Sequence, residues 1–154
     1  MKITIVAAGK IREKWISAGI EEYTKRLKRY CTVDIVEVAD SPDTLSTELA
    51  LSKEAEKILL KIKPGAFVVL LDPMGVTLDS IAFSGSFASW MERGGAEITF
   101  VIGSSRGVGR EIKNRADLSL SISAMTFTHQ MARLLLLEQC YRGFRIRNGE
   151  PYHK

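Results

Sequence analysis

The sequence has few of the features that mark membrane, secreted or metal-binding proteins. Its longest uninterrupted apolar run, Ala66–Leu71, is far shorter than the ~20 residues that a transmembrane helix needs. The apolar stretch Ile3–Ala8 is likewise too short for the core of a signal peptide. The two cysteines, Cys31 and Cys140, form neither a metal-ligand spacing nor a disulfide framework. We therefore expect a cytoplasmic protein in a reducing compartment, with no membrane segment and no metal.

The composition also lacks the bias that marks disordered or repetitive chains. The chain has 154 residues, of which 45% are hydrophobic and 26% charged, and both fractions are typical of globular proteins. No linker, low-complexity segment or internal repeat interrupts it. A chain of this length can bury a sizeable core, so we predict a single domain that spans residues 1–154.

Basic residues are unevenly distributed, which the modest net charge of +4 conceals. Residues 1–30 carry eight Lys and Arg against three acidic residues, and residues 129–154 carry five against two. The segment between them is slightly acidic. Clustered basic charge of this kind fits contact with nucleic-acid phosphates. Ordinary solvated helix faces are the open alternative.

The pattern of apolar residues predicts alternating strands and helices. Strands are expected at 2–7, 32–38, 67–71, 98–102 and 118–123, and helices at 11–30, 45–63, 80–93, shortly after 109, and 128–147. Because apolar strands alternate with helices, we predict an α/β fold with a mainly parallel sheet and helices on both faces.

Three loops are expected where strands end: a polar turn at 71–75, a glycine-rich loop at 103–109, and residues 121–128. Ligands of such sheets bind at the carboxyl ends of the strands, so we expect one pocket built from all three loops. The glycines of the second loop let a ligand approach the backbone closely. Their spacing matches neither the dinucleotide fingerprint nor a P-loop, which argues against a nucleotide phosphate cradle.

The last predicted helix is unusual in its run of four leucines, Leu134–Leu137. Successive helical residues lie ~100° apart, so these side chains cover almost the whole circumference. We expect one face of the helix to pack on the sheet and another on a partner subunit. A wholly intramolecular central helix is the alternative. Glu138 and Arg142 are four residues apart, so a structural ion pair explains them at least as well as catalysis.

Four motifs occur together, at 1–10 (MKITIVAAGK), 101–107 (VIGSSRG), 121–133 (SISAMTFTHQMAR), and 141–142 (YR) with 151–154 (PYHK). In this order and over essentially the whole chain, they resemble the bacterial SPOUT-class ribosomal RNA methyltransferases. Those enzymes methylate N3 of pseudouridine 1915 in large-subunit (23S) ribosomal RNA. A SPOUT enzyme that acts on transfer RNA and a non-enzymatic RNA-binding protein remain the alternatives.

This resemblance implies a SPOUT fold with a C-terminal trefoil knot, S-adenosylmethionine as cofactor, and a homodimer that acts on large-subunit RNA or an assembled ribosome. The family's cofactor contacts fall on the three loops, at Leu71, Gly103, Ile122, Ser123, Ala124, Met125, Thr126 and Phe127. One departure is visible, because members of the family often have Gly-Gly where this chain has Gly103-Ser104.

The resemblance also gives a function to the C-terminal residues, which would otherwise be interpreted as a frayed tail. His153 is the candidate to assist removal of the N3 proton, and Tyr152 the candidate to stack on or hydrogen-bond the target base. Arg142, Lys154 and His129 are candidates to bind the substrate. For His129, a structural role at the start of a helix is an equal alternative.

Overall fold

The computed structural model describes residues 1–154 and contains one five-stranded sheet. The strands are β1 (Lys2–Ala8), β2 (Thr32–Val38), β3 (Phe67–Thr77), β4 (Glu97–Ile102) and β5 (Leu118–Ser121). They are all parallel and lie in the order β2-β1-β4-β3-β5. The helices are α1 (Lys14–Leu27), α2 (Thr47–Leu59), α3 (Ser80–Arg93), α4 (Arg110–Arg115) and α5 (His129–Arg147). None of them combines the length and the apolar character that a bilayer span requires.

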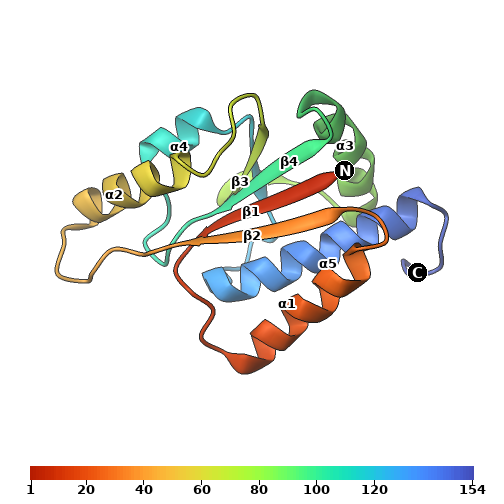
Figure 1. The fold of residues 1–154 in the computed structure, drawn as a ribbon, viewed down its shortest axis with the longest axis horizontal. Coiled ribbons are helices and arrows are strands. Elements are labelled where there is room, and N and C mark those ends of the chain that lie inside the picture. The colour runs from red at the N-terminus through yellow and green to blue at the C-terminus, as the bar shows by residue number, and fades with distance from the viewer.

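Helices cover both faces of the sheet, with α1, α3 and α5 on one face and α2 and α4 on the other (Figure 1). Successive side chains of a strand point to opposite faces, so the interior strand β1 contributes to both cores. Its Ile3 and Ile5 are fully buried in the first core, whereas Val6 is fully buried in the second. The predicted α/β class and its parallel sheet are confirmed, while the trefoil knot stays a prediction.

Strand β3 differs most from the sequence prediction, because it does not end in a polar turn after Leu71. Leu71 and Val76 both pair with Leu120 of β5, so residues 72–75 bulge out of the ladder before pairing resumes. Gly75 passes so close to β5 that a Cβ there would lie 2.5 Å from the Ser119 carbonyl carbon. The Asp-Pro-Met-Gly composition is typical of a turn, and the partner strand that overrides it comes much later in the chain.

Several elements are shorter than predicted, and side-chain hydrogen bonds explain where α1 and α2 begin. α1 begins at Lys14 rather than residue 11 because the backbone N–H of Ile11 donates to Glu37, and that of Arg12 to Gln130. α2 begins at Thr47 because the hydroxyl of Ser46 accepts the Leu49 N–H and caps the helix. β5 ends at residue 121 rather than 123, which leaves the following segment free of the sheet.

Helix α5 lies between α1 and α3 across the sheet (Figure 1). Leu136 and Leu137 are fully buried, and Leu134 packs against Gly19 of α1. Only Leu135 is half-buried without belonging to the core. The fold of one chain thus buries Leu136 and Leu137, whereas Leu134 and Leu135 stay partly exposed, and the expected contact of α5 with a partner subunit stays a prediction.

Candidate cofactor pocket and C-terminal polar network

A cavity of about 250 Å³ lies where β3, β4 and β5 reach the carboxyl edge of the sheet. Residues of all three predicted loops line it, so the expected common pocket is present. Of the eight residues predicted to bind the cofactor, seven line the cavity: Leu71, Gly103, Ile122, Ser123, Met125, Thr126 and Phe127. Ala124 does not line it. No group of three or more His, Cys, Asp or Glu side chains is arranged to hold a metal ion.

The loop that follows β5 lines this cavity and contains backbone N–H groups that have no partner in the protein. Among the N–H groups of Ile122–Phe127, only that of Met125 has a partner in the protein, the Ser123 hydroxyl at 3.0 Å. The apolar side chains of Leu71, Met125 and Phe127 stand beside these free groups. A flat heteroaromatic ring needs apolar surfaces for its faces and hydrogen-bonding groups for its edge. The residues present therefore fit the adenine end of S-adenosylmethionine.

The glycine-rich loop is closed by its own contacts. Ser104 and Gly107 form an isolated antiparallel bridge, and the Ser104 hydroxyl accepts the Arg106 N–H. A Cβ on Gly103 would overlap with the Gly107 carbonyl oxygen and lie 2.5 Å from Val108 Cγ1. Gly103 is thus required by the closure of the loop, and its predicted contact with the cofactor stays a prediction.

Serine in place of the family's second glycine fits this loop without backbone strain. Gly107 has a φ of +94°, which favours glycine, whereas Ser104 is not among the residues with positive φ. The serine also contributes the hydroxyl that holds the turn.

His129 occupies the first position of α5 and lines the cavity. Burial is the main cause that lowers its pKa, the nearby Arg133 guanidinium lowers it further, and Asp40 opposes both. The ring is therefore neutral near pH 7. The structure places His129 at the pocket and at the helix start, so both interpretations of its role remain open.

The lowered pKa of His129 predicts a pH-dependent stability. The unfolded chain binds this proton more readily than the folded one, so the free energy of unfolding should fall as the pH drops below about 6.5 and level off below the folded-state pKa. Because the ring is partly exposed, we expect the loss to stay below about 1 kcal/mol. Urea unfolding between pH 7.5 and 5 should show it in the wild type and not in His129→Asn. Parallel pH profiles for the two proteins would contradict this assignment.

Arg133 is fully buried and joins α5 to the ends of two strands. Its guanidinium donates to the carbonyl oxygens of Ala8 and Gly9 and lies 2.8 Å from the Glu37 carboxylate. Burial lowers its pKa, an effect that Glu37 opposes. Sequence reasoning assigned no role to Arg133, yet this side chain fixes the start of α5 against the end of β1 and thereby holds one wall of the pocket.

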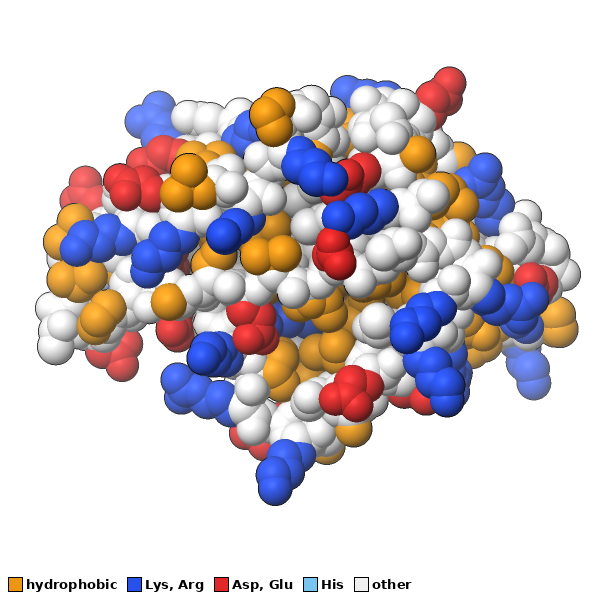
Figure 2. Space-filling view, in the orientation of Figure 1, with side chains coloured by type: hydrophobic (Ala, Val, Ile, Leu, Met, Phe, Trp, Pro, Cys, Tyr) orange, Lys and Arg blue, Asp and Glu red, His pale blue; other side chains and the backbone are white.

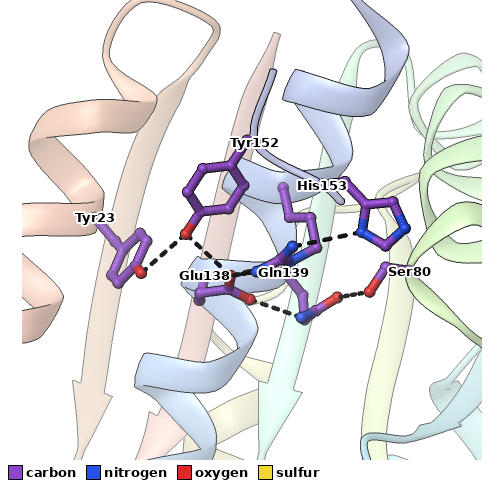
Figure 3. A network of polar contacts seen from close by, with 7 residues as sticks. Tyr23, Ser80, Glu138, Gln139, Tyr152 and His153 are labelled. Atoms are coloured by element: carbon purple, nitrogen blue, oxygen red, sulfur yellow. Dashed lines mark hydrogen bonds and ion pairs between the residues drawn. The ribbon is translucent and has the colours of Figure 1, made fainter. Parts of the chain in front are cut away.

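The C-terminal residues do not form a frayed or mobile tail, because Tyr152 is packed into the structure (Figure 3). Its hydroxyl lies 3.2 Å from that of Tyr23 and donates to Glu138 Oε1 at 3.1 Å. Its ring meets Tyr141 edge-on, with 4.9 Å between centroids. Burial is the main cause that raises the pKa of Tyr152, so the phenol stays protonated at neutral pH.

Glu138 connects these contacts, as Figure 3 shows. It forms the predicted ion pair with Arg142, whose Nη2 lies 2.5 Å from Oε1, and it accepts a hydrogen bond from Gln139 at 2.7 Å. Gln139 in turn accepts the Ser80 hydroxyl of α3. Arg142 also covers the Tyr152 ring. The guanidinium that was predicted to bind substrate is thus largely committed within the chain, because Glu138 is its nearest anion.

His153 and Lys154 are exposed, beyond Tyr152. The Nδ1 atom of His153 lies 3.4 Å from Arg142 Nη1. An Arg guanidinium only donates, so this contact needs the lone pair on Nδ1 and places the proton of the neutral ring on Nε2. The free nitrogen of His153 is therefore a donor in this arrangement.

The pocket and the catalytic candidates lie at opposite ends of α5. His129 lines the pocket at the first residue of the helix, whereas His153 contacts Arg142, thirteen residues further on. At 1.5 Å per residue the two sites are about 20 Å apart along the helix. The structure thus brings together the predicted cofactor residues and, separately, the C-terminal candidates. It does not bring the two groups together within one chain.

A family model described as a predicted SPOUT methyltransferase matches residues 1–153. The chain belongs to the SPOUT methyltransferase family. Similar proteins over the full length of both chains include those named "Ribosomal RNA large subunit methyltransferase H" from Acetivibrio thermocellus, at 48% identity, and from Clostridium kluyveri, at 47%.

A solved structure shares the SPOUT methyltransferase's fold at low sequence identity. It is a "probable methylase family protein" from Haemophilus influenzae, with a TM-score of 0.57 and 16% identity. The match covers 96% of this methyltransferase and 66% of that longer chain. Sequence reasoning had anticipated the family, but it missed Tyr23, Gln139 and Ser80 as parts of the C-terminal network. Only the Glu138–Arg142 spacing gave a signal for that network.

Proposed function

We propose that this enzyme transfers a methyl group from S-adenosylmethionine to N3 of a pseudouridine in large-subunit ribosomal RNA. The observation that carries the proposal is the pocket whose free backbone groups and apolar walls suit an adenine ring. The full-length similarity to proteins named as ribosomal RNA large subunit methyltransferases supports the substrate class. Such a substrate would also place the protein in the cytoplasm.

The residues around the cavity would hold the cofactor in two ways. Backbone groups of Ile122–Phe127 would bind the edge of the adenine, while Leu71, Met125 and Phe127 would cover its faces. When bound, S-adenosylmethionine supplies a methyl group already activated by its sulfonium, so the protein must mainly position the acceptor nitrogen and exclude water.

The acceptor nitrogen must lose a proton, which would pass to water, and the C-terminal residues would assist this loss by stabilising the anion. His153 presents Nε2–H, which would donate to a carbonyl beside N3 and stabilise the anion that remains. Tyr152, held by Tyr23 and Glu138, stays a protonated phenol that would stack on or hydrogen-bond the base. Arg142 would mainly position His153 and Tyr152, through its contact with the imidazole and its stacking on the phenol ring.

A homodimer would complete this site, because about 20 Å separates the pocket from His153 in one chain. In a symmetric dimer the same surface of each subunit faces the other. If α5 of one subunit ran antiparallel to that of its partner, the C-terminal residues of each would reach the pocket of the other. Exposed apolar side chains at the pocket, among them Met125 and Phe127, favour such a cover.

The two basic ends of the sequence meet beside Tyr152, which supports an RNA substrate. Figure 2 shows Lys and Arg side chains crowded where α1 ends near the C-terminus, whereas over α2 they are interspersed with acidic ones. Four exposed basic residues end α1: Lys25, Arg26, Lys28 and Arg29. Lys154 is exposed on the same side, so phosphates on either side of the target base would find positive charge.

The test is methyl transfer from tritiated S-adenosylmethionine to ribosomes, separated subunits and transfer RNA, all taken from cells that lack the protein. We expect label only in large-subunit RNA, at N3 of a pseudouridine. Label in transfer RNA would favour the other SPOUT activity. If the protein binds RNA but calorimetry detects no binding of S-adenosylmethionine, it is a non-enzymatic RNA-binding protein.

Leu135→Glu tests the proposed dimer. Leu135 is the one leucine of the run that does not pack against the core, so a charge there should oppose a subunit interface on α5. We expect light scattering to show dissociation at micromolar concentration, and stability and methyl transfer to fall together. Leu60→Glu is the matched control, because Leu60 is 84% exposed at the end of α2 on the opposite face. A wild-type protein that is monomeric would refute the dimer outright.

A further inference from the structure

We propose that Asp72 and Lys113 form a subsite for the amino-acid end of S-adenosylmethionine, an inference that rests on the proposed cofactor. They are the only Asp, Glu, Lys or Arg side chains that line the cavity. Asp72 follows Leu71 directly in the bulge of β3, and Lys113 lies on α4. Two different elements thus place one negative and one positive group side by side in the wall of the cavity, 3.5 Å apart.

The Asp72 carboxylate is fixed in position and has one oxygen available to bind a cation. Its side chain is only 13% exposed, and its Oδ1 atom accepts the Met74 N–H at 3.0 Å, which fixes the carboxylate within the bulge. Its Oδ2 atom has no hydrogen-bond donor in the protein, and its nearest cation is Lys113 Nζ at 3.5 Å. That distance is longer than the 2.7–2.9 Å typical of a charge-assisted hydrogen bond. One oxygen of a nearly buried carboxylate therefore remains available.

The Lys113 ammonium is likewise available to bind a ligand. It makes no hydrogen bond within the protein, and its side chain is 53% exposed. A half-exposed ion pair at this separation contributes little to stability, typically ~0–1 kcal/mol, so separating the two groups costs little. The flexible lysine can move outward while Asp72 stays in place.

A zwitterionic amino-acid group is complementary to this pair. Its ammonium and carboxylate are joined through a single carbon, so both can insert between the two side chains, with the ammonium on Asp72 and the carboxylate on Lys113. The methionine part of S-adenosylmethionine carries such a group, whereas its adenosine part does not. The subsite would therefore distinguish the complete cofactor from nucleosides that fill only the apolar part of the pocket.

The experiment compares three ligands by calorimetry on the full chain. S-adenosylmethionine and S-adenosylhomocysteine both carry the amino-acid group, whereas 5′-methylthioadenosine lacks it. For Lys113→Met we expect about tenfold weaker binding of the first two ligands and unchanged binding of the third. Asp72→Asn keeps the oxygen that accepts the Met74 N–H and should give the same pattern. Arg110→Met removes a positive charge from the same helix outside the cavity, so it should change none of the affinities.

The outcomes separate this inference from the proposed function. If Lys113→Met and Asp72→Asn weaken all three ligands equally, or none of them, the subsite is wrong while cofactor binding stands. If only S-adenosylmethionine is weakened, the pair senses the sulfonium charge and the amino-acid subsite is again wrong. If the wild type binds none of the three ligands, the proposed cofactor fails, and the subsite fails with it.

Discussion

His153→Ala should lower methyl transfer to ribosomes by ~10² while leaving S-adenosylmethionine affinity unchanged. The side chain is exposed, and its one polar contact is with Arg142, about 20 Å along α5 from the pocket, so its removal should disturb neither folding nor the cavity. Single-turnover transfer and calorimetry on the same preparation measure the two quantities. His153→Gln keeps a side-chain donor, so it should retain more activity than the alanine variant.

Normal transfer by His153→Ala would show that the N3 proton leaves without this residue. Deletion of residues 151–154 is a harsher test, because it also removes Tyr152 from its contacts with Tyr23, Tyr141 and Glu138. We expect the deletion to abolish transfer and to cost about 1–2 kcal/mol of stability through the lost aromatic packing. If the truncated protein no longer binds S-adenosylmethionine, residues 151–154 are structural and the catalytic role assigned to His153 is wrong.

Gly103→Val should weaken S-adenosylmethionine binding by at least tenfold, a loss of more than ~1.4 kcal/mol. The cause is indirect, because a Cβ at this position would overlap with the Gly107 carbonyl oxygen and crowd Val108. The turn from Gly103 to Gly107 must then open, and the wall of the cavity moves with it. Calorimetry on the variant measures the loss.

Gly85→Ala is the matched control for Gly103→Val. Gly85 lies on α3, and a Cβ there meets no atom within 4 Å. This substitution should leave binding unchanged and stabilise the helix by roughly 0.5–1 kcal/mol. If a folded Gly103→Val protein binds S-adenosylmethionine with wild-type affinity, the glycine-rich loop is not part of the cofactor site.

The order and type of the elements could be predicted from the sequence because the apolar periodicity agrees with the tertiary structure almost everywhere. β2 and α3 have the predicted bounds, and the remaining helix ends differ by a few residues; at the start of α1, the Gln130 side chain accepts a backbone N–H that the predicted first turn would contain. The continuation of β3 could not be predicted, since the local composition of residues 72–75 is typical of a turn. Its pairing with Leu120 is a long-range contact that the local pattern does not report.

The pocket was predictable for a simple geometric reason, because the carboxyl ends of parallel strands meet at one edge. The state of the C-terminal residues was not. Tyr152 contacts Tyr23 only because α1 and α5 lie side by side, and the spacing of the two tyrosines in the sequence does not indicate this contact. The separation of His153 from the pocket likewise depends on its contact with Arg142, which the sequence spacing does not indicate.

The burial of Arg133 has a consequence for how the chain acquires its structure. Its hydrogen bond to the Ala8 carbonyl joins residues 125 apart in sequence, and β1 must wait for β4 before it has its second neighbour. Contacts of such high contact order form late, because the entropy of closing a long loop is lost before they stabilise the fold. During synthesis the apolar side of α1 therefore stays uncovered until α5 has emerged. Folding of this domain should be largely post-translational, and the growing chain should depend on chaperones for most of its synthesis.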